Sequence, residues 1–357
     1  MSPSSRRPNT QKRLLSLLTY LALFVFSGIF ILPFLWMLSS SFKSLDTIFE
    51  YPPSLIPTEF VAVERAGKSL PVADYSPPQG SPQTVLITDE RPNEYQVEPY
   101  QGKSLPPTPD TQPPTSSSWV PISAVKKQRQ VHIRFQNYRE AWEAEPFAQF
   151  ALNTVIITSF GIIGQVMSAS LVAFAFARLE WPGRKFFFLL VLATMMLPSE
   201  VTMIPTYLIF RHLGWIDTFL PLIVPSFLGG GAFSIFLFRQ FFLTLPKELD
   251  EAAQIDGCSS FGIYRHILMP LCKPIIATIA IFSFVGHWND FLTPLIYLNS
   301  TEKFTLAIAL RFFQGAYNTD MHLLMAASTL MLLPVILVFF LGQKHFVKSI
   351  VMSGTKG

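Results

Sequence analysis

The chain has 357 residues, of which 50% are hydrophobic and only 14% are charged. Because a soluble domain carries about a quarter charged residues, this composition argues against an ordinary soluble protein and indicates a chain that lies partly in lipid. The formal net charge of +4 gives no sign of a nucleic-acid-binding protein. The two cysteines, Cys258 and Cys272, predict no disulfide framework.

Apolar segments of membrane-spanning length recur along the chain. A bilayer core of about 30 Å requires roughly 20 apolar residues in a helix. Six segments meet or nearly meet this requirement, at residues 14–38, 150–177, 186–210, 220–243, 274–298 and 322–341. Prolines interrupt the third and a Gly-Gly-Gly run interrupts the fourth, which neighbouring helices can tolerate by satisfying the freed backbone groups. The sequence therefore predicts an all-α membrane protein with six transmembrane helices.

The first apolar segment could instead be a signal peptide, because Arg6, Arg7, Lys12 and Arg13 precede it. However, about 25 apolar residues exceed a signal-peptide core, and no small-residue cleavage site follows. We therefore expect an uncleaved anchor helix.

Basic residues between the spans predict the orientation, because cytoplasmic segments of membrane proteins carry an excess of Lys and Arg. With the N-terminus inside, each inside segment is basic: Arg6, Arg7, Lys12 and Arg13; Arg178, Arg184 and Lys185; Lys247, Arg265 and Lys273; Lys344, Lys348 and Lys356. The short outside loops hold few basic residues: Arg211, Lys303 and Arg311. Both termini are therefore predicted to be cytoplasmic.

The long segment between the first two spans, residues 43–147, is then extracytoplasmic. Its middle is rich in proline, most of all at residues 104–121. Proline and serine at this density favour a linker of polyproline character. The alternative is a small β-rich cap, because residues 83–90 and 129–138 alternate enough to form strands.

The chain carries no recognisable enzyme signature. Phosphate-binding loops, HExxH and GxSxG motifs are absent, and no pair of its histidines has helical ligand spacing. We therefore expect no catalytic site, metal or cofactor in this chain.

Ionisable residues at membrane depth are candidates for function. Glu200 lies between two prolines in a broken span, and Asp290 follows Trp288 and Asn289, an aromatic–amide–carboxylate cluster suited to sugar hydroxyls. The alternative is that both carboxylates lie near an interface or bond to adjacent helices. Two isolated carboxylates do not form the relay that a proton-coupled carrier uses.

The stretch "KELDEAAQIDGCSSFGIYRHILMP" gathers four carboxylates between two apolar segments. Pro246 suits a first helical turn, Gly257 a left-handed C-terminal cap, and Ser259 or Ser260 the N-cap of a second helix ending at Pro270. We expect a short helix, a turn and a second helix on the cytoplasmic side. The alanines of the short helix allow close backbone approach, so a groove of another protein could receive it. A solvated amphipathic loop is the alternative.

The run Glu251-Ala252-Ala253, then Gly257, then Ile267 and Pro270, resembles the EAA loop of binding-protein-dependent ABC importer permeases. The spacing EAA-x3-G-x9-I-x-x-P is kept in full. This chain has Cys258 where the family usually has alanine and Met269 where leucine is usual.

More of the chain is similar to the carbohydrate subgroup, specifically the smaller, maltose-transporter-type permease. The stretches that carry the resemblance include "NYREAW", "AFARLEWPGRKFFF", "WNDFLTPLIYL" and "QKHFVKSIVMSGTKG". The resemblance covers about residues 10–60 and 134–357 and leaves out about 61–133. It implies a first helix within residues 1–42, a permease core at 148–343 with the EAA loop at 246–270, and a cytoplasmic tail at 344–357.

The resemblance implies a type I ABC importer permease fold in a prokaryotic cell membrane, with a Pro-rich extracytoplasmic insertion between helices 1 and 2. The implied partners are a second permease subunit, ATPase subunits that bind ATP and Mg, and an extracytoplasmic solute-binding protein that delivers a sugar. Glu251 would anchor the docking helix, Ala252 and Ala253 would permit close packing, and Gly257, supported by Asp256, would make the turn. A stand-alone secondary carrier or channel is the alternative from another class, and a membrane enzyme is a third.

Overall fold

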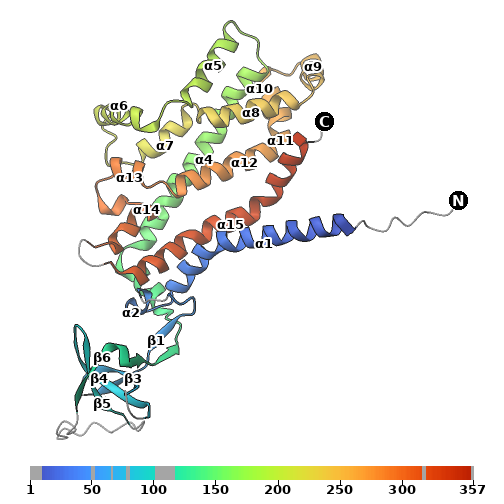
Figure 1. Ribbon diagram of the computed structural model, residues 1–357. Helices are drawn as coiled ribbons and strands as arrows, with labels where there is room; N and C mark the ends of the chain where they lie inside the picture. The colour runs from blue at the N-terminus through green and yellow to red at the C-terminus, as the bar shows by residue number, and fades with distance from the viewer. Residues whose placement is uncertain are drawn as a thin grey trace, which may run out of the picture. The chain divides into compact units, whose positions relative to one another are not determined.

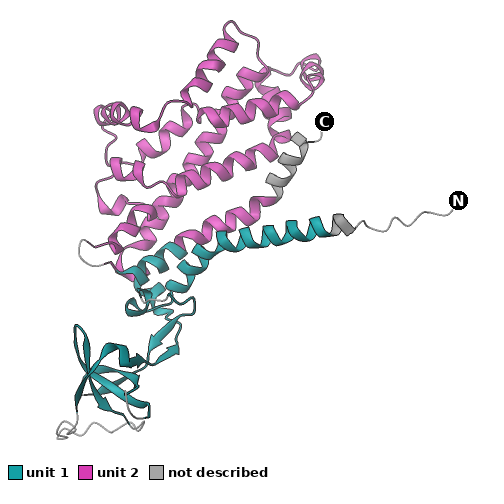
Figure 2. Ribbon diagram, viewed as in Figure 1, with its two compact units in different colours: residues 1–140, 320–329 teal, residues 141–319, 330–357 magenta. Residues whose placement is uncertain are grey.

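The computed structural model describes residues 10–49, 53–65, 67–77, 81–100, 117–315 and 319–354. The chain divides into two compact units (Figure 2), namely residues 1–140 with 320–329, and residues 141–319 with 330–357.

Four helical segments of the described chain are long and apolar enough to cross a membrane: Leu14–Ser40, Phe147–Ala177, Leu220–Thr244 and Met321–Gln343. Two further helix pairs pass the same test but are bent, by 99° between Arg184–Thr194 and Ser199–His212, and by 79° between Ser260–Leu271 and Lys273–Trp288. The prediction of a membrane protein built on long apolar helices is confirmed, whereas the all-α prediction is wrong, because strands form within residues 58–131. The number of spans is four, or six if each bent pair is one span.

The first unit contains helices α1 (Thr10–Ser40) and α2 (Leu45–Ile48), followed by a β module. The strands of the module are β2 (Ala62–Arg65), β3 (Lys68–Tyr75), β4 (Gln83–Arg91), β5 (Glu94–Pro99), β6 (Ser118–Pro121) and β7 (Val125–Lys127). They follow the order β2-β3-β4-β5-β6, and β7 pairs with β3. Strands β3, β4, β5 and β6 are labelled together in Figure 1. Because the short 3-10 turn η1 (Ile122–Ala124) joins β6 directly to β7, this pairing curls the antiparallel sheet back on itself.

Apolar side chains from most strands fill the centre of this module. Ala73, Val85, Ile87, Val97 and Val120 are nearly inaccessible to solvent and pack in one cluster with Tyr95. Fully burying a Val or Ile side chain contributes about 1.5–3 kcal/mol, so these residues account for an ordered module where composition favoured a linker. The linker interpretation is therefore wrong for the described part of the segment, and the densest proline run, residues 101–116, lies outside the described residues.

Two short strands join the module to the rest of its unit. β1 (Thr58–Phe60) pairs antiparallel with β8 (Arg129–Val131), and the His132 amide donates to the Pro57 carbonyl at 3.2 Å. The chain therefore enters and leaves the module through adjacent strands of one ribbon.

The second unit is helical, and α4 (Phe147–Ala177) is its central helix. Its other helices are α5 (Arg184–Thr194), α6 (Ser199–His212), α7 (Leu220–Phe227), α8 (Ala232–Thr244), α9 (Glu248–Ile255), α10 (Ser260–Gly262), α11 (Met269–Leu271), α12 (Lys273–Trp288), α13 (Leu292–Tyr297) and α14 (Leu306–Ala309). The π-helical η2 (Ile263–Leu268) and the 3-10 turns η3 (Thr301–Lys303) and η4 (Leu310–Phe313) complete it. Helices α3 (Gln136–Ala144) and α15 (Met321–Gly354) contribute to both units. Helix α4 packs against α7, α8 and α12, with Phe238 and Phe242 of α8 fully buried.

The interruptions predicted in the spans have clear backbone causes. The third span breaks before Pro198, whereas α6 continues through Pro205. Gly229, Gly230 and Gly231 all have positive φ, between 64° and 111°, and separate α7 from α8. Such angles suit residues without a Cβ atom. A Cβ at Gly230 would also lie 2.6 Å from the Gln165 carbonyl oxygen, so this glycine lets the break pack tightly on α4.

The fifth apolar segment differs from the predicted 274–298. Helix α12 already ends at Trp288, because the Asp290 side chain accepts a hydrogen bond from the Thr293 amide at 3.1 Å and so starts the separate helix α13. The bent segment Ser260–Leu271 precedes α12, and the two form one span only if the 79° bend lies within it.

Candidate functional site: the α9 loop

The predicted helix–turn–helix exists and is built as its residues favour. Helix α9 begins at Glu248, two residues after Pro246, and its first turn carries Glu248, Asp250 and Glu251. Acidic side chains there interact favourably with the positive end of the helix dipole. The sequence thus places negative charge where the helix itself stabilises it.

A glycine ends α9. Gly257 has φ of 78°, its amide donates to the Gln254 carbonyl at 3.0 Å, and the Cys258 amide donates to the Ala253 carbonyl at 2.9 Å. These two bonds form the Schellman arrangement that commonly closes helices at a left-handed glycine. Ser259 then caps the next helix by accepting from the Gly262 amide at 3.2 Å.

The two alanines of the EAA run differ in exposure. Ala253 is 7% exposed and belongs to the same buried cluster as Phe174 of α4 and Phe242 of α8. Ala252 and Glu251 are exposed, and Ile255 is 87% exposed. Helix α9 is therefore seated on its own subunit by one face and presents a small residue, a carboxylate and an apolar side chain on the other.

A second residue of the inner face forms a buried ion pair with α4. The Arg178 guanidinium Nε lies 3.2 Å from Asp250 Oδ2, with side chains only 4% and 14% exposed. Arg178 also donates to the Leu245 carbonyl, at the end of α8, at 3.0 Å. Burial raises the pKa of the Asp250 carboxyl, while Arg178 and Lys247 act to lower it. One side chain therefore holds together the ends of α4 and α8 and the start of α9.

The remaining EAA residues lie on the second helix and the turn. Ile267 is partly buried against the cluster that holds Ala253, whereas Pro270 and Asp256 are exposed. Between them the chain is π-helical, and the Tyr264 hydroxyl lies 2.8 Å from the Ser170 hydroxyl of α4. Short π-helical segments are frequent at functional sites, and sequence reasoning did not predict this one.

The candidate solute-pathway residues do not form one cluster. Trp288 is 5% exposed and donates through Nε1 to the Met331 carbonyl at 3.0 Å, and Asn289 donates to the Val285 carbonyl. Glu200 is exposed on α6 and accepts from the Ser199 hydroxyl at 3.1 Å. These bonds give Trp288, Asn289 and Asp290 structural partners, and their part in solute movement stays a prediction.

Sequence reasoning missed a polar network midway along α4. The Gln165 amide donates to Ser234 of α8 at 2.7 Å and accepts from Ser283 of α12 at 3.0 Å. Ser168 donates to the Ser226 carbonyl of α7 at 2.7 Å. The signal was a glutamine and several serines inside apolar runs, which is weaker than a charged residue because uncharged polar groups are common in helix packing.

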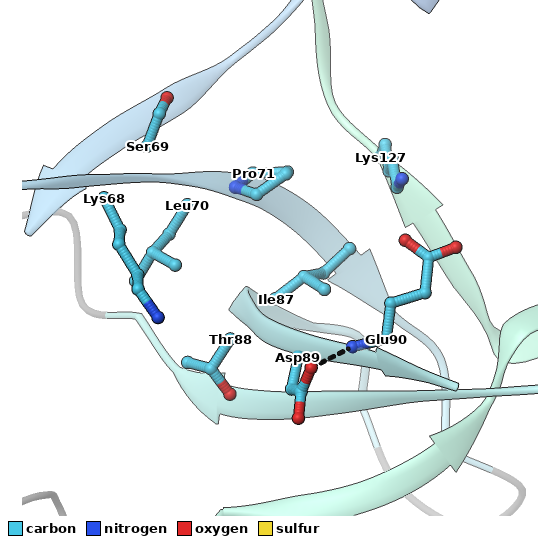
Figure 3. Close-up of a pocket in the computed structure, with 9 residues that line it drawn as sticks. All are labelled: Lys68, Ser69, Leu70, Pro71, Ile87, Thr88, Asp89, Glu90 and Lys127. Carbon is cyan, nitrogen blue, oxygen red and sulfur yellow. Dashed lines mark hydrogen bonds between the residues drawn. The ribbon is translucent and has the colours of Figure 1, made fainter.

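No group of three or more His, Cys, Asp or Glu residues that could hold a metal occurs in the described ranges. A surface pocket of about 380 Å³ lies on the β module, between β3, β4 and Lys127 of β7 (Figure 3). Lys68, Asp89 and Glu90 line it, and Asp89 accepts a bond from the Glu90 amide in its own strand. None of the predicted site residues is part of this pocket.

Residues 147–352 match the family of binding-protein-dependent transport system inner membrane components. The chain belongs to this family. It is accordingly a multi-pass membrane permease of a binding-protein-dependent transport system in a prokaryotic cell, and the resemblance read from the EAA loop is confirmed.

Curated relatives of this permease are transport permease proteins. An arabinooligosaccharides transport system permease protein of Halalkalibacterium halodurans is 36% identical over 57% of this chain and 73% of its own length. The melibiose/raffinose/stachyose import permease protein of Bacillus subtilis is 34% identical over 63% of this chain and 82% of its own length. An sn-glycerol-3-phosphate transport system permease protein of Brucella abortus is 38% identical over 60% of this chain and 79% of its own length.

A solved structure extends the comparison to the fold. A chain of a bacterial ABC transporter involved in import of the acidic polysaccharide alginate aligns with a TM-score of 0.65, at 20% identity, over 97% of this permease and 100% of that chain. At this identity the likeness shows the fold alone, the type I ABC importer permease fold that the sequence predicted.

Proposed function

We propose that this permease is one of two membrane subunits of an ABC importer for a sugar or oligosaccharide, and that an ATPase subunit binds its helix α9. The outer face of α9 is the observation that supports the docking. Glu251 and Ala252 lie exposed on a helix that Ala253 and Asp250 fix from behind, so a partner's groove can receive the helix without displacing it.

The proposal places ATP and Mg in the partner ATPase, and the membrane chain supplies the pathway. An extracytoplasmic solute-binding protein would deliver the solute. Two of the relatives named above carry sugars in their names, arabinooligosaccharides and melibiose, raffinose and stachyose, which supports this solute class. A third names sn-glycerol-3-phosphate, so a polyol phosphate is the alternative solute.

The basic residues between spans support an orientation with both termini and α9 in the cytoplasm and the β module outside. Accessibility of single cysteines to an impermeant thiol reagent tests this orientation in intact cells. Thr88→Cys in the module should be labelled without lysis and Gln254→Cys in α9 only after it, in a background without Cys258 and Cys272. The reverse pattern would invert the topology.

Docking is tested with the permease reconstituted beside its second permease and ATPase subunits. The wild-type complex should retain the ATPase on purification, and Glu251→Lys should lose it because the exposed carboxylate at the contact is reversed. Glu180→Lys, an equal charge reversal in the loop after α4, is the matched control and should retain the ATPase. Uptake by wild-type vesicles that lack any ATPase would instead identify a stand-alone carrier.

The solute class is tested by uptake in the same vesicles. Arabinooligosaccharides, raffinose and glycerol 3-phosphate are offered one at a time with the solute-binding protein present. ATP-dependent accumulation of a sugar supports the proposal, and accumulation of glycerol 3-phosphate alone would replace the sugar by a polyol phosphate.

A further inference from the structure

The Arg178–Asp250 pair joins α9 to the ends of two other helices. Arg178 is the residue that ends α4, and its own amide still bonds to the Phe174 carbonyl at 2.9 Å. Its guanidinium reaches the Leu245 carbonyl, where α8 ends, and the Asp250 carboxylate in the first turn of α9. Three helices therefore meet at one planar, permanently charged group, which binds several acceptors in fixed directions.

The pair is energetically unusual. Among the described residues, Arg178 Nε and Asp250 Oδ1 are buried atoms without a hydrogen-bond partner. Burying two charges costs several kcal/mol of desolvation free energy per ion, and incomplete hydrogen bonding offsets only part of this cost. A buried pair with such geometry is a poor device for stability alone, and each unsatisfied atom of this kind calls for another explanation.

Its position suggests that explanation. Asp250 and Ala253 are three residues apart and lie on the inner face of α9, while the residues of the proposed docking face point away. Ala253 supplies an apolar contact, which is non-directional and can slide. The ion pair supplies the charged contact between α9 and the ends of two membrane-embedded helices.

We infer that Arg178 and Asp250 act as a strut that makes the ends of α4 and α8 move together with α9 when the bound ATPase subunits change state. The inference rests on the proposed docking of the ATPase. Arg178 and Asp250 are positioning residues, because neither lies on the face that meets the ATPase.

The test measures whether α9 and α4 move as one body. Nitroxide labels are placed at Gln254→Cys on α9 and at Leu171→Cys on α4, both exposed, with Cys258 and Cys272 replaced by serine. Pulsed electron spin resonance then gives the distance between the labels in the reconstituted transporter, with and without ATP plus vanadate. In the wild-type background the distance should stay the same in both states.

Asp250→Asn keeps the shape of the side chain and removes its charge. It should retain the ATPase on purification, yet the distance between the labels should shift or broaden when ATP and vanadate are added. The exchanged double variant Arg178→Asp with Asp250→Arg should restore most of the constant distance, because the pair is re-formed. Glu180→Gln removes a carboxylate from the neighbouring loop and should behave as wild type.

A merely structural pair would give other results. An Asp250→Asn distance that stays constant in both states would overturn the inference, as would loss of the ATPase from this variant, because the pair would then serve docking itself. A wild-type complex that never retains the ATPase would refute the proposed function, and with it the strut.

Discussion

At the two ends of the Leu220–Thr244 span, a carboxylate holds neighbouring segments together in two different ways. Asp217, in the loop before α7, accepts bonds from the Asn299 and Ser300 amides at 2.9 Å, the Ser300 hydroxyl at 2.5 Å and the Lys303 ammonium at 3.0 Å. Asp250, after α8, has one close cation and an unpartnered oxygen within the described chain.

The surroundings shift the pKa values of these two carboxyl groups in opposite directions. Hydrogen bonds from Ser300, then Asn299 and Lys303, hold the pKa of Asp217 well below its usual range. Burial raises the pKa of Asp250, and Arg178 only partly offsets this. The first carboxylate contributes to stability, since many donors favour its charged form, whereas the second is held in place at a cost in free energy.

Arg178→Met is the substitution that should lower the stability of the permease most. It leaves the Asp250 carboxylate buried without its cation, and breaking a buried pair from one side costs about 3–5 kcal/mol. We expect a large fall in the thermal unfolding temperature of the purified permease in detergent. An unchanged temperature would show that water reaches the Asp250 site.

Asp217→Asn should have the next largest effect. The substitution removes the charge but keeps the backbone, because Asp217 has φ of 60° and asparagine tolerates this left-handed conformation. Loss of the charge-assisted bonds should lower stability by about 2 kcal/mol, measured by the same thermal unfolding. Asp217→Ala is the informative companion, since it should cost more by adding backbone strain.

The two carboxylates should also respond to pH with opposite signs. Asp217 has a lowered folded-state pKa, so its contribution is present above its ordinary value of 3.8 and is lost as the pH falls below it. The stability difference between wild type and Asp217→Asn should therefore shrink on acidification. For Asp250, whose folded-state pKa is raised, wild type should gain relative to Asp250→Asn as the pH falls towards 3.8. Equal slopes for both variants would contradict the assignment.

Lys303→Met should show the smallest effect. The Lys303 side chain is 40% exposed, and exposed ion pairs contribute about 0–1 kcal/mol. The other donors to Asp217 remain, so thermal unfolding should change little and the change should vanish in high salt. A larger loss would mean that this cation, rather than the amides, holds the loop.

The sequence predicted the parts of this molecule that depend on local chemistry. The Gly257 cap, the Ser259 N-cap and the break at Gly229–Gly231 follow from what these residues can adopt, and all three are present. Strand β4 forms where alternation had offered a strand as the alternative to a linker. Of residues 129–138, the other stretch offered, only Arg129–Val131 form a strand, and α3 already begins at Gln136. Composition misled because it averaged the Pro-rich run with the strands beside it.

Contacts between distant segments were out of reach of such reasoning. Nothing in the sequence pairs Arg178 with Asp250, which are 72 positions apart, or shows that Ala253 is buried while Ala252 is exposed. Both facts depend on how α9 packs against α4 and α8. The Gln165 network was equally hidden, because its partners come from two other helices, α8 and α12.

The ribbon formed by β1 and β8 has a consequence for how this chain can be altered. Because Pro57 and His132 are joined by a backbone hydrogen bond, the chain enters and leaves the β module at two neighbouring residues. A short turn between these points could replace the module, and a foreign domain with neighbouring termini could be grafted in its place. The β module can therefore be exchanged as a unit, and the helices can keep their own contacts whichever domain is inserted between these two points.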